Sequence, residues 1–214
     1  MKKVVEIYTE YKIPQNLQDH MLRVAAVASL LCDSVNIFVD KSNIVLAELF
    51  HDMGNIIKFN WETLLEFREP EGIEYWQKVQ KEFIAKYGPD EQKANLAIAA
   101  ELGLKKEAIA LIDKMHFHNN CLNARAKNLD LKIINYADQR VSPHGVVSYN
   151  ERMEEARVRY RWDEREDREE RAKLIACGKE IEKQIFAHCK IKPEDITDEA
   201  VAPIIEELKK FVIK

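Results

Sequence analysis

Residues 47–55 read AELFHDMGN, and this stretch places His51 and Asp52 side by side at the end of an apolar segment. His20 stands earlier in the chain and Asp138 much later, each also embedded in apolar sequence. Burying an unpaired charge or polar group costs more than a local contact returns. These four side chains therefore predict a shared partner in the interior, and a metal ion would satisfy all of them.

Apolar residues recur every three or four positions through most of the chain, which predicts helix after helix. We expect a first helix of about twenty residues after Pro14 and a second from Asp40 or Ser42 to His51. Further helices are expected over 73–87, 90–102, 105–115, around 131–141 until Pro143, over 148–188 and over 198–213. No strand or internal repeat is expected. With six Gly and six Pro among 214 residues, 46% of them hydrophobic, the composition is typical of a globular all-α protein.

Residues 148–188 carry a dense run of both charge signs, ERMEEARVRYRWDEREDREER. Opposite charges recur there at the i,i+4 spacing of a helix, in the pairs Glu155/Arg159, Glu164/Arg168 and Asp167/Arg171. Acidic residues outnumber arginines in this run, so we interpret it as a solvated helix face rather than a surface for nucleic acid.

The overall charge and the absence of long apolar runs exclude several classes of function. A formal net charge of −4 offers no general attraction to a nucleic-acid polymer or an anionic membrane. No segment has the roughly 18 apolar residues of a membrane span, and the first residues lack the apolar core of a signal peptide. The cysteines form no CxxC pair, so a zinc ribbon or disulfide framework is not expected, and a reducing cytoplasm fits; they are Cys32, Cys121, Cys177 and Cys189.

The order His20, His51-Asp52, Asp138 resembles the HD superfamily of metal-dependent phosphohydrolases, over roughly residues 15–145. The resemblance implies an all-α HD helical bundle, which we place at residues 1–147, with a C-terminal helical extension at 148–214 packed on the same domain. The stretch after Asp138 also looks like an uncharacterised subfamily of HD hydrolases.

A single divalent cation bound by these four residues is what the resemblance implies. Spacing alone does not show this for His51 and Asp52, because neighbours on a helix diverge by about 100°. A nitrogen and oxygen ligand set without thiolate suits Mn²⁺, Fe²⁺, Co²⁺, Ni²⁺ or Mg²⁺, and Zn²⁺ is compatible. Such an ion activates a bound water, so we expect hydrolysis of a phosphomonoester or phosphoanhydride, in a small substrate that is most plausibly a nucleotide.

Further residues are assigned to proton transfer and to substrate binding. Asp52 and His116 are the expected catalytic groups. Arg23 follows His20 by three positions, so on a helix both point the same way and the guanidinium could clamp a phosphate. The other expected substrate-binding residues are Asn55, Lys58 and Arg140, with Arg125 as a further basic candidate.

Two features depart from the family pattern and keep an alternative open. Asn55 stands where many family members carry Lys or Glu, and asparagine cannot titrate. His116 and His118 are similar to histidines that hold a second metal in some relatives, but residues 90–97 lack the other histidine, so a two-metal site is not expected. The alternative is a catalytically silent HD module that senses a nucleotide or binds a partner. The last two helices could support a homodimer, whereas a di-iron oxygenase would need more ligands than are evident.

Overall fold

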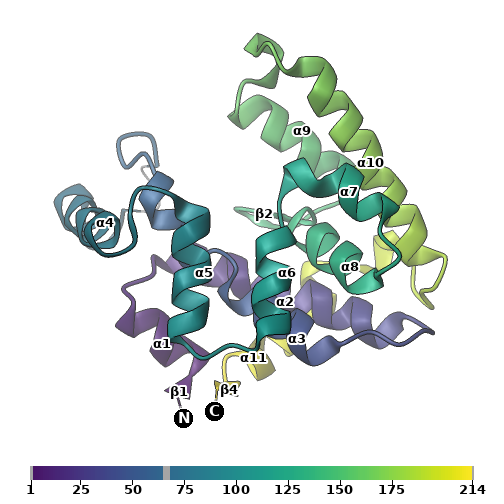
Figure 1. The fold of residues 1–214 in the computed structure, drawn as a ribbon, viewed down its shortest axis with the longest axis horizontal. Coiled ribbons are helices and arrows are strands. Elements are labelled where there is room, and N and C mark those ends of the chain that lie inside the picture. The colour runs from purple at the N-terminus through teal and green to yellow at the C-terminus, as the bar shows by residue number, and fades with distance from the viewer. Residues whose placement is uncertain (1, 65–67, 214) are drawn as a thin grey trace.

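A computed structural model describes residues 2–64 and 68–213, and eleven α-helices account for most of that part of the chain (Figure 1). The helices are α1 (Val4–Glu10), α2 (Gln15–Ser34), α3 (Lys41–Phe50), α4 (Ile73–Tyr87), α5 (Glu91–Glu101), α6 (Lys106–Lys114), α7 (Asn120–Arg125), α8 (Leu129–Asp138), α9 (Tyr149–Arg159), α10 (Arg168–Phe186) and α11 (Asp198–Leu208). Short 3-10 turns follow several of them, at η1 (Asn55–Lys58), η3 (Phe117–Asn119), η4 (Trp162–Glu164) and η5 (Pro193–Asp195). The all-α prediction is confirmed.

Helix α2 lies at the centre and packs against α3, α8 and α11. Pro14 precedes its first turn, where the missing amide hydrogen of proline does no harm. The side chains of α2 are buried almost all round, including Met21, Val24 and Leu31, each with no exposed surface. A helix buried on so many sides is a fixed platform, and His20 lies in its second turn.

Helix α3 brings the HD pair to the same place. Its first turn is capped by Asp40, whose carboxylate accepts a hydrogen bond from the Asn43 amide at 3.1 Å. The helix ends at Phe50, so His51 and Asp52 form its last, unwinding turn. The turn continues through Gly54 into η1.

Four two-residue strands were not expected from the sequence. β1 (Lys2–Lys3) pairs antiparallel with β4 (Val212–Ile213), which brings the two ends of the described chain together (Figure 1). β2 (Val141–Ser142) pairs with β3 (Gly145–Val146), so the helix predicted to run to Val141 instead ends at Asp138. Each pair involves so few residues that no alternation of polar and apolar side chains marks it in the sequence.

The prediction of one long helix over 148–188 is wrong. The segment forms a hairpin of α9 and α10, which extends away from the rest of the molecule (Figure 1). Arg161 adopts a left-handed conformation at the bend, with φ 47°, and the next residue, Trp162, is buried and stacks on Phe117 at 5.4 Å. Burying the indole stabilises the bend, because it removes a large apolar surface from water.

The bend also decides which predicted charge pairs form. Arg159 pairs with Glu155 within α9, and Arg171 in α10 pairs at 2.7 Å with Asp167, the residue before that helix. The predicted pair of Glu164 with Arg168 is absent from the described residues, because η4 and α10 are separate elements there.

A disulfide framework was not expected from the sequence, and the described residues contain one disulfide. Cys121 in α7 and Cys177 in α10 form a disulfide, while Cys32 and Cys189 are free. The two partners are 56 residues apart in the sequence, so their spacing gave no sign of the pairing. The disulfide joins the C-terminal hairpin to the helices around α8.

Both predicted ranges, 1–147 and 148–214, contribute side chains to one hydrophobic core. From the second range, Tyr149, Ile181, Ile185 and Val201 are nearly or completely buried. The boundary at residue 147 stays a prediction. Among the described residues, no helix combines the length and hydropathy needed to cross a bilayer.

Candidate metal centre

Three helices deliver the four predicted ligands to one place. His20 comes from α2, His51 and Asp52 from the end of α3, and Asp138 is the last residue of α8. Because α2 packs against both α3 and α8, the ends of these helices meet. His20, His51 and Asp52 each offer a ligand atom within 4.8 Å of the others, and they form a cluster that could hold a metal ion.

Asp138 completes the arrangement through its contacts with both imidazoles. Its Oδ1 lies 3.2 Å from His20 Nε2 and 3.7 Å from His51 Nε2. Asp52 Oδ2 faces the same two nitrogens, at 3.7 Å from His20 and 3.5 Å from His51. Two carboxylates and two imidazole nitrogens thus converge, and the ring centroids of the histidines are 5.5 Å apart.

The Nε2 nitrogen of His51 has no hydrogen-bond partner among the described residues. The His51 side chain is 5% exposed, and its Nδ1 lies 2.8 Å from the backbone carbonyl of Glu48, which accepts a hydrogen from it. This contact orients the ring so that Nε2 points at Asp52 and Asp138, but neither carboxylate is within hydrogen-bond distance of it. Histidines that bind a metal through one ring nitrogen are commonly oriented in this way, because the other ring nitrogen donates to a carbonyl or carboxylate.

The charges in the cluster act on one another strongly. Burial alone would lower the pKa of His51, but Asp52, Asp138 and Glu48 outweigh it and raise that pKa to about 10. Burial would likewise raise the pKa of the Asp138 carboxyl, whereas the two imidazoles hold it well below its usual range. The cluster therefore attracts positive charge, and a divalent cation fits the donor set because it replaces the protons and satisfies Nε2 directly.

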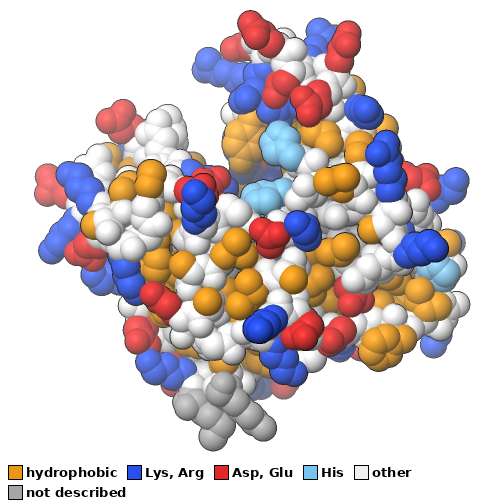
Figure 2. Space-filling view, in the orientation of Figure 1, with side chains coloured by type: hydrophobic (Ala, Val, Ile, Leu, Met, Phe, Trp, Pro, Cys, Tyr) orange, Lys and Arg blue, Asp and Glu red, His pale blue; other side chains and the backbone are white. Residues whose placement is uncertain are grey.

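His116 lies close enough to Asp52 and to Lys58 for both charges to act on its imidazole. Burial lowers the pKa of His116, the positive charge of Lys58 lowers it further, and the carboxylates of Asp52 and Glu91 oppose this. Lys58 is half exposed, and its Nζ lies 3.8 Å from Glu91 Oε1. His118, two residues after His116, is exposed, and Figure 2 shows histidine side chains at the surface beside the hollow between the α4–α5 side and the α9–α10 side.

Asn55 begins η1 and is buried directly behind the HD pair. Its backbone amide donates to the Asp52 carbonyl at 3.0 Å, and its side-chain oxygen lies 3.5 Å from Asn95 Nδ2. The side chain is therefore directed at α5, and the expected contact with substrate has no support from this placement.

Arg140 does not join the cluster, because its guanidinium is engaged elsewhere. The side chain is 2% exposed and donates to the carbonyls of Val147, Pro193 and Ile196 and to the Tyr136 hydroxyl. These contacts fasten α8 to the C-terminal segment. The expected contact of Arg140 with substrate has no support from this placement, since each of the three guanidinium nitrogens already donates to a protein oxygen.

The remaining basic candidates lie nearer the surface. Arg23 is partly buried on α2, one turn after His20, and its Nε lies 3.5 Å from Asp198 in the first turn of α11. Arg125 is exposed at the end of α7. Of the cations proposed from the sequence, Lys58 is the one whose charge acts on His116.

Sequence reasoning missed Glu48, which lies under the cluster. Its carboxylate is completely buried, both oxygens lack a hydrogen-bond partner among the described residues, and one lies 3.7 Å from His51 Nδ1. Burial raises its pKa well above the usual range, although His51 opposes this. The signal was available, because a glutamate three positions before His51 interrupts the apolar AELF segment on the same helix face.

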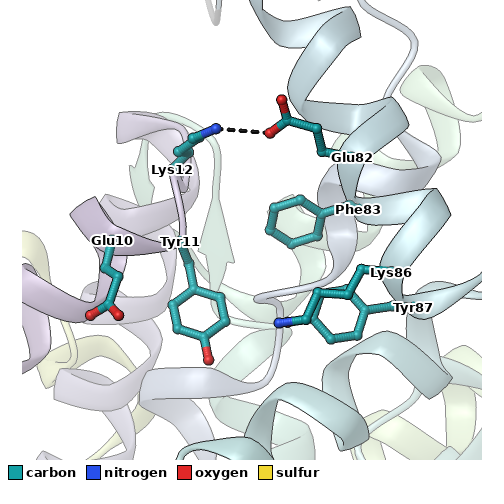
Figure 3. A pocket seen from close by; sticks show the side chains of 7 residues that line it. All are labelled: Glu10, Tyr11, Lys12, Glu82, Phe83, Lys86 and Tyr87. Atoms are coloured by element: carbon teal, nitrogen blue, oxygen red, sulfur yellow. Dashed lines mark hydrogen bonds and ion pairs between the residues drawn. The ribbon is translucent and has the colours of Figure 1, made fainter.

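A separate cavity of about 300 Å³ lies between the end of α1 and helix α4 (Figure 3). Its walls include Tyr11, Phe83 and Tyr87, together with charged groups that already have partners. Lys12 pairs with Glu82 at 2.8 Å, as Figure 3 shows. None of the residues predicted to bind metal or substrate lines this cavity.

Comparison with known proteins agrees with the geometry. The model of the HD domain family matches residues 17–140, a range that contains all four proposed ligands. Searches of curated proteins and of solved structures gave no match. Because the family model covers more than half of the chain, and its range begins in α2 and ends just after Asp138, the protein belongs to the HD domain family.

Proposed function

We propose that this protein is a metal-dependent phosphohydrolase that cleaves a phosphomonoester or phosphoanhydride, most plausibly in a nucleotide. The observation that carries the proposal is the buried Nε2 of His51, which faces the carboxylates of Asp52 and Asp138 without a hydrogen-bond partner. Membership in the HD family supports it, since that family belongs to the metal-dependent phosphohydrolase superfamily.

His20, His51, Asp52 and Asp138 would hold one divalent cation, which would supply a water activated near neutral pH and polarise a phosphate oxygen. The chain's own residues do the rest. The α2, α3 and α8 ends keep the four side chains together before any ion binds, so little has to move. Lys58 offers a positive charge beside the cluster for a phosphate oxygen, at the cost of its weak, exposed pair with Glu91.

His116 is suited to proton transfer. Because burial and Lys58 lower its pKa, the imidazole is neutral at neutral pH and can accept a proton at a ring nitrogen. Asp52, whose charge acts on His116, is the second group that we propose to assist proton transfer.

The test compares metal content and phosphate release for the wild type, His51→Ala and His188→Ala. His188 is a partly exposed histidine after α10 and serves as the matched control. We expect the wild type and His188→Ala to bind about one equivalent of Mn²⁺, Co²⁺ or Ni²⁺ and to release phosphate from a member of a nucleotide and phosphomonoester panel. Metal-loaded wild type that turns over no substrate would contradict the enzyme proposal, and failure to bind any ion would contradict the metal site.

A catalytically silent module remains a second candidate, because the basic side chains near the site have other partners. Arg23 lies against Asp198, Lys58 against Glu91, and Arg140 is fastened to carbonyls. A sensor of this kind gains thermal stability from a nucleotide without releasing phosphate. A thermal shift with each nucleotide of the panel, followed by a phosphate assay on the same samples, separates the two functions.

A further inference from the structure

The turn that carries Asp52 is held from behind by helix α5. The Gly54 backbone amide donates a hydrogen bond to Asn95 Oδ1 at 2.5 Å, and Asn95 Nδ2 lies 3.5 Å from Asn55 Oδ1. The Asn95 residue is 2% exposed, so no water competes for the Gly54 contact from the surface. A buried amide of this kind is costly unless its hydrogen bonds are made, which makes the contact specific.

The backbones of the turn and of α5 approach so closely at Gly54 that a side chain would not fit. A Cβ atom at this position would lie 2.7 Å from Ala94 Cβ and 2.9 Å from the Glu91 carbonyl oxygen. The backbone of Gly54 is not strained, since its φ is −92°, and so glycine is needed here for space alone. This close approach is a second observation, independent of the Asn95 hydrogen bond, that the turn and α5 are packed as one unit.

The turn does not need Asn95 for its own closure. The Asn55 amide already donates to the Asp52 carbonyl at 3.0 Å, and Ile57 donates to the Gly54 carbonyl at 3.1 Å. What Asn95 determines is the position of the turn relative to α5. Since Asp52 lies two residues before Gly54, a shift of the turn would move its carboxylate away from His20 and His51.

Helix α5 also holds Lys58. Glu91 lies one turn before Asn95 on the same helix, and its carboxylate lies 3.8 Å from Lys58 Nζ. One helix therefore contacts the turn that carries a proposed metal ligand, through Asn95, and the nearby cation, through the exposed pair of Glu91 with Lys58.

We propose that Asn95 is a positioning residue of the metal centre, which grips the Gly54 amide and thereby directs the Asp52 carboxylate at His20 and His51. The proposal rests on the proposed function in one respect, that the cluster binds a divalent cation. Asn95 itself touches neither the cation nor the substrate.

The test is a calorimetric titration of metal-stripped protein with Mn²⁺, together with urea unfolding of the metal-free protein. Asn95→Leu removes the acceptor, whereas Asn95→Asp keeps an oxygen for the Gly54 amide. Asn123→Leu is the matched control, because Asn123 is also buried and its side chain also bonds to the backbone, donating to the Lys114 carbonyl at 3.2 Å.

Asn95→Leu should weaken Mn²⁺ binding about 10- to 100-fold, the usual effect of losing a residue that orients a ligand. Asn95→Asp should bind within about threefold of the wild type, and Asn123→Leu should lose stability but bind Mn²⁺ as the wild type does. If Asn95 had only a structural role, Asn95→Leu would lower the free energy of unfolding and leave the affinity for Mn²⁺ unchanged.

Equal Mn²⁺ affinity of wild type and Asn95→Leu would overturn the inference while leaving the metal site intact. No Mn²⁺ binding by the wild type would instead refute the proposed site itself. If Asn95→Leu does not fold, Asn95→Ser takes its place, since the serine hydroxyl is too short to reach the Gly54 amide.

Discussion

Replacement of Gly178 by alanine tests how closely the C-terminal hairpin packs on the rest of the molecule. Gly178 lies in the interior of α10, and a Cβ added there would lie 2.0 Å from Tyr149 Oη, 2.5 Å from Tyr149 Cζ and 2.9 Å from Asn120 Nδ2. Both neighbours hold α10 by hydrogen bonds, Tyr149 to the Ile175 carbonyl and Asn120 to the Leu174 carbonyl, each at 3.0 Å. A methyl group at residue 178 would displace both.

The expected change in the free energy of unfolding follows from these contacts. Alanine gains about 1 kcal/mol over glycine in a helix interior. Overpacking costs about 1–3 kcal/mol, and two weakened buried hydrogen bonds cost about 1 kcal/mol each. The sum predicts that Gly178→Ala loses about 2–4 kcal/mol, opposite in sign to helix propensity.

Urea unfolding followed by circular dichroism, with the disulfide kept oxidised, measures the effect. Ala176 is exposed on the same helix, so Ala176→Gly should lose only about 1 kcal/mol and calibrates the propensity. Tyr149→Phe removes the nearest atom, and the double variant with Gly178→Ala should show a favourable coupling of at least about 0.5 kcal/mol. A Gly178→Ala protein as stable as the wild type would refute the packing described here.

Three further predictions concern buried charge and the disulfide. Glu48→Met should raise the free energy of unfolding of the metal-free protein by about 1–3 kcal/mol, because it removes a buried carboxyl group whose oxygens have no hydrogen-bond partner among the described residues; a less stable variant in urea would contradict this. Burial lowers the pKa of Lys132 in the folded protein, and the charge of Glu180 opposes this shift. The unfolded state therefore binds more protons, so the free energy of unfolding should rise with pH between the lowered pKa and about 10.4. Lys132→Met should abolish this rise in unfolding curves taken from about pH 8 to 10.5. Replacing Cys121 and Cys177 together by serine should cost about 2–4 kcal/mol, and a melting temperature equal to that of the oxidised wild type would argue against the pairing.

Local sequence patterns determined most of the helices. The expected helix over 73–87 coincides with α4, and the helix expected after Pro14 is α2. Helical periodicity depends on neighbours three and four positions apart, so it can be recognised without knowing the fold. The same reasoning placed His20 and Asp138 on apolar faces, which is why both could be named as candidates for one site.

Contacts between distant segments could not be predicted in this way. The bend at Arg161 depends on a cavity for Trp162 beside Phe117, and the role of Arg140 depends on carbonyls some fifty residues later in the chain. Nothing in the local sequence of either residue reveals the partner.

The sequence by itself therefore determined the helical class of this protein, because periodicity is a local property, and its resemblance to the HD superfamily named the four side chains of the candidate metal centre. Only the tertiary structure decided that those side chains converge, that Glu48 lies beneath them and that Asn95 holds their turn. The physical reason is that helix packing, through close approaches such as the one at Gly54, sets these distances between elements far apart in the chain.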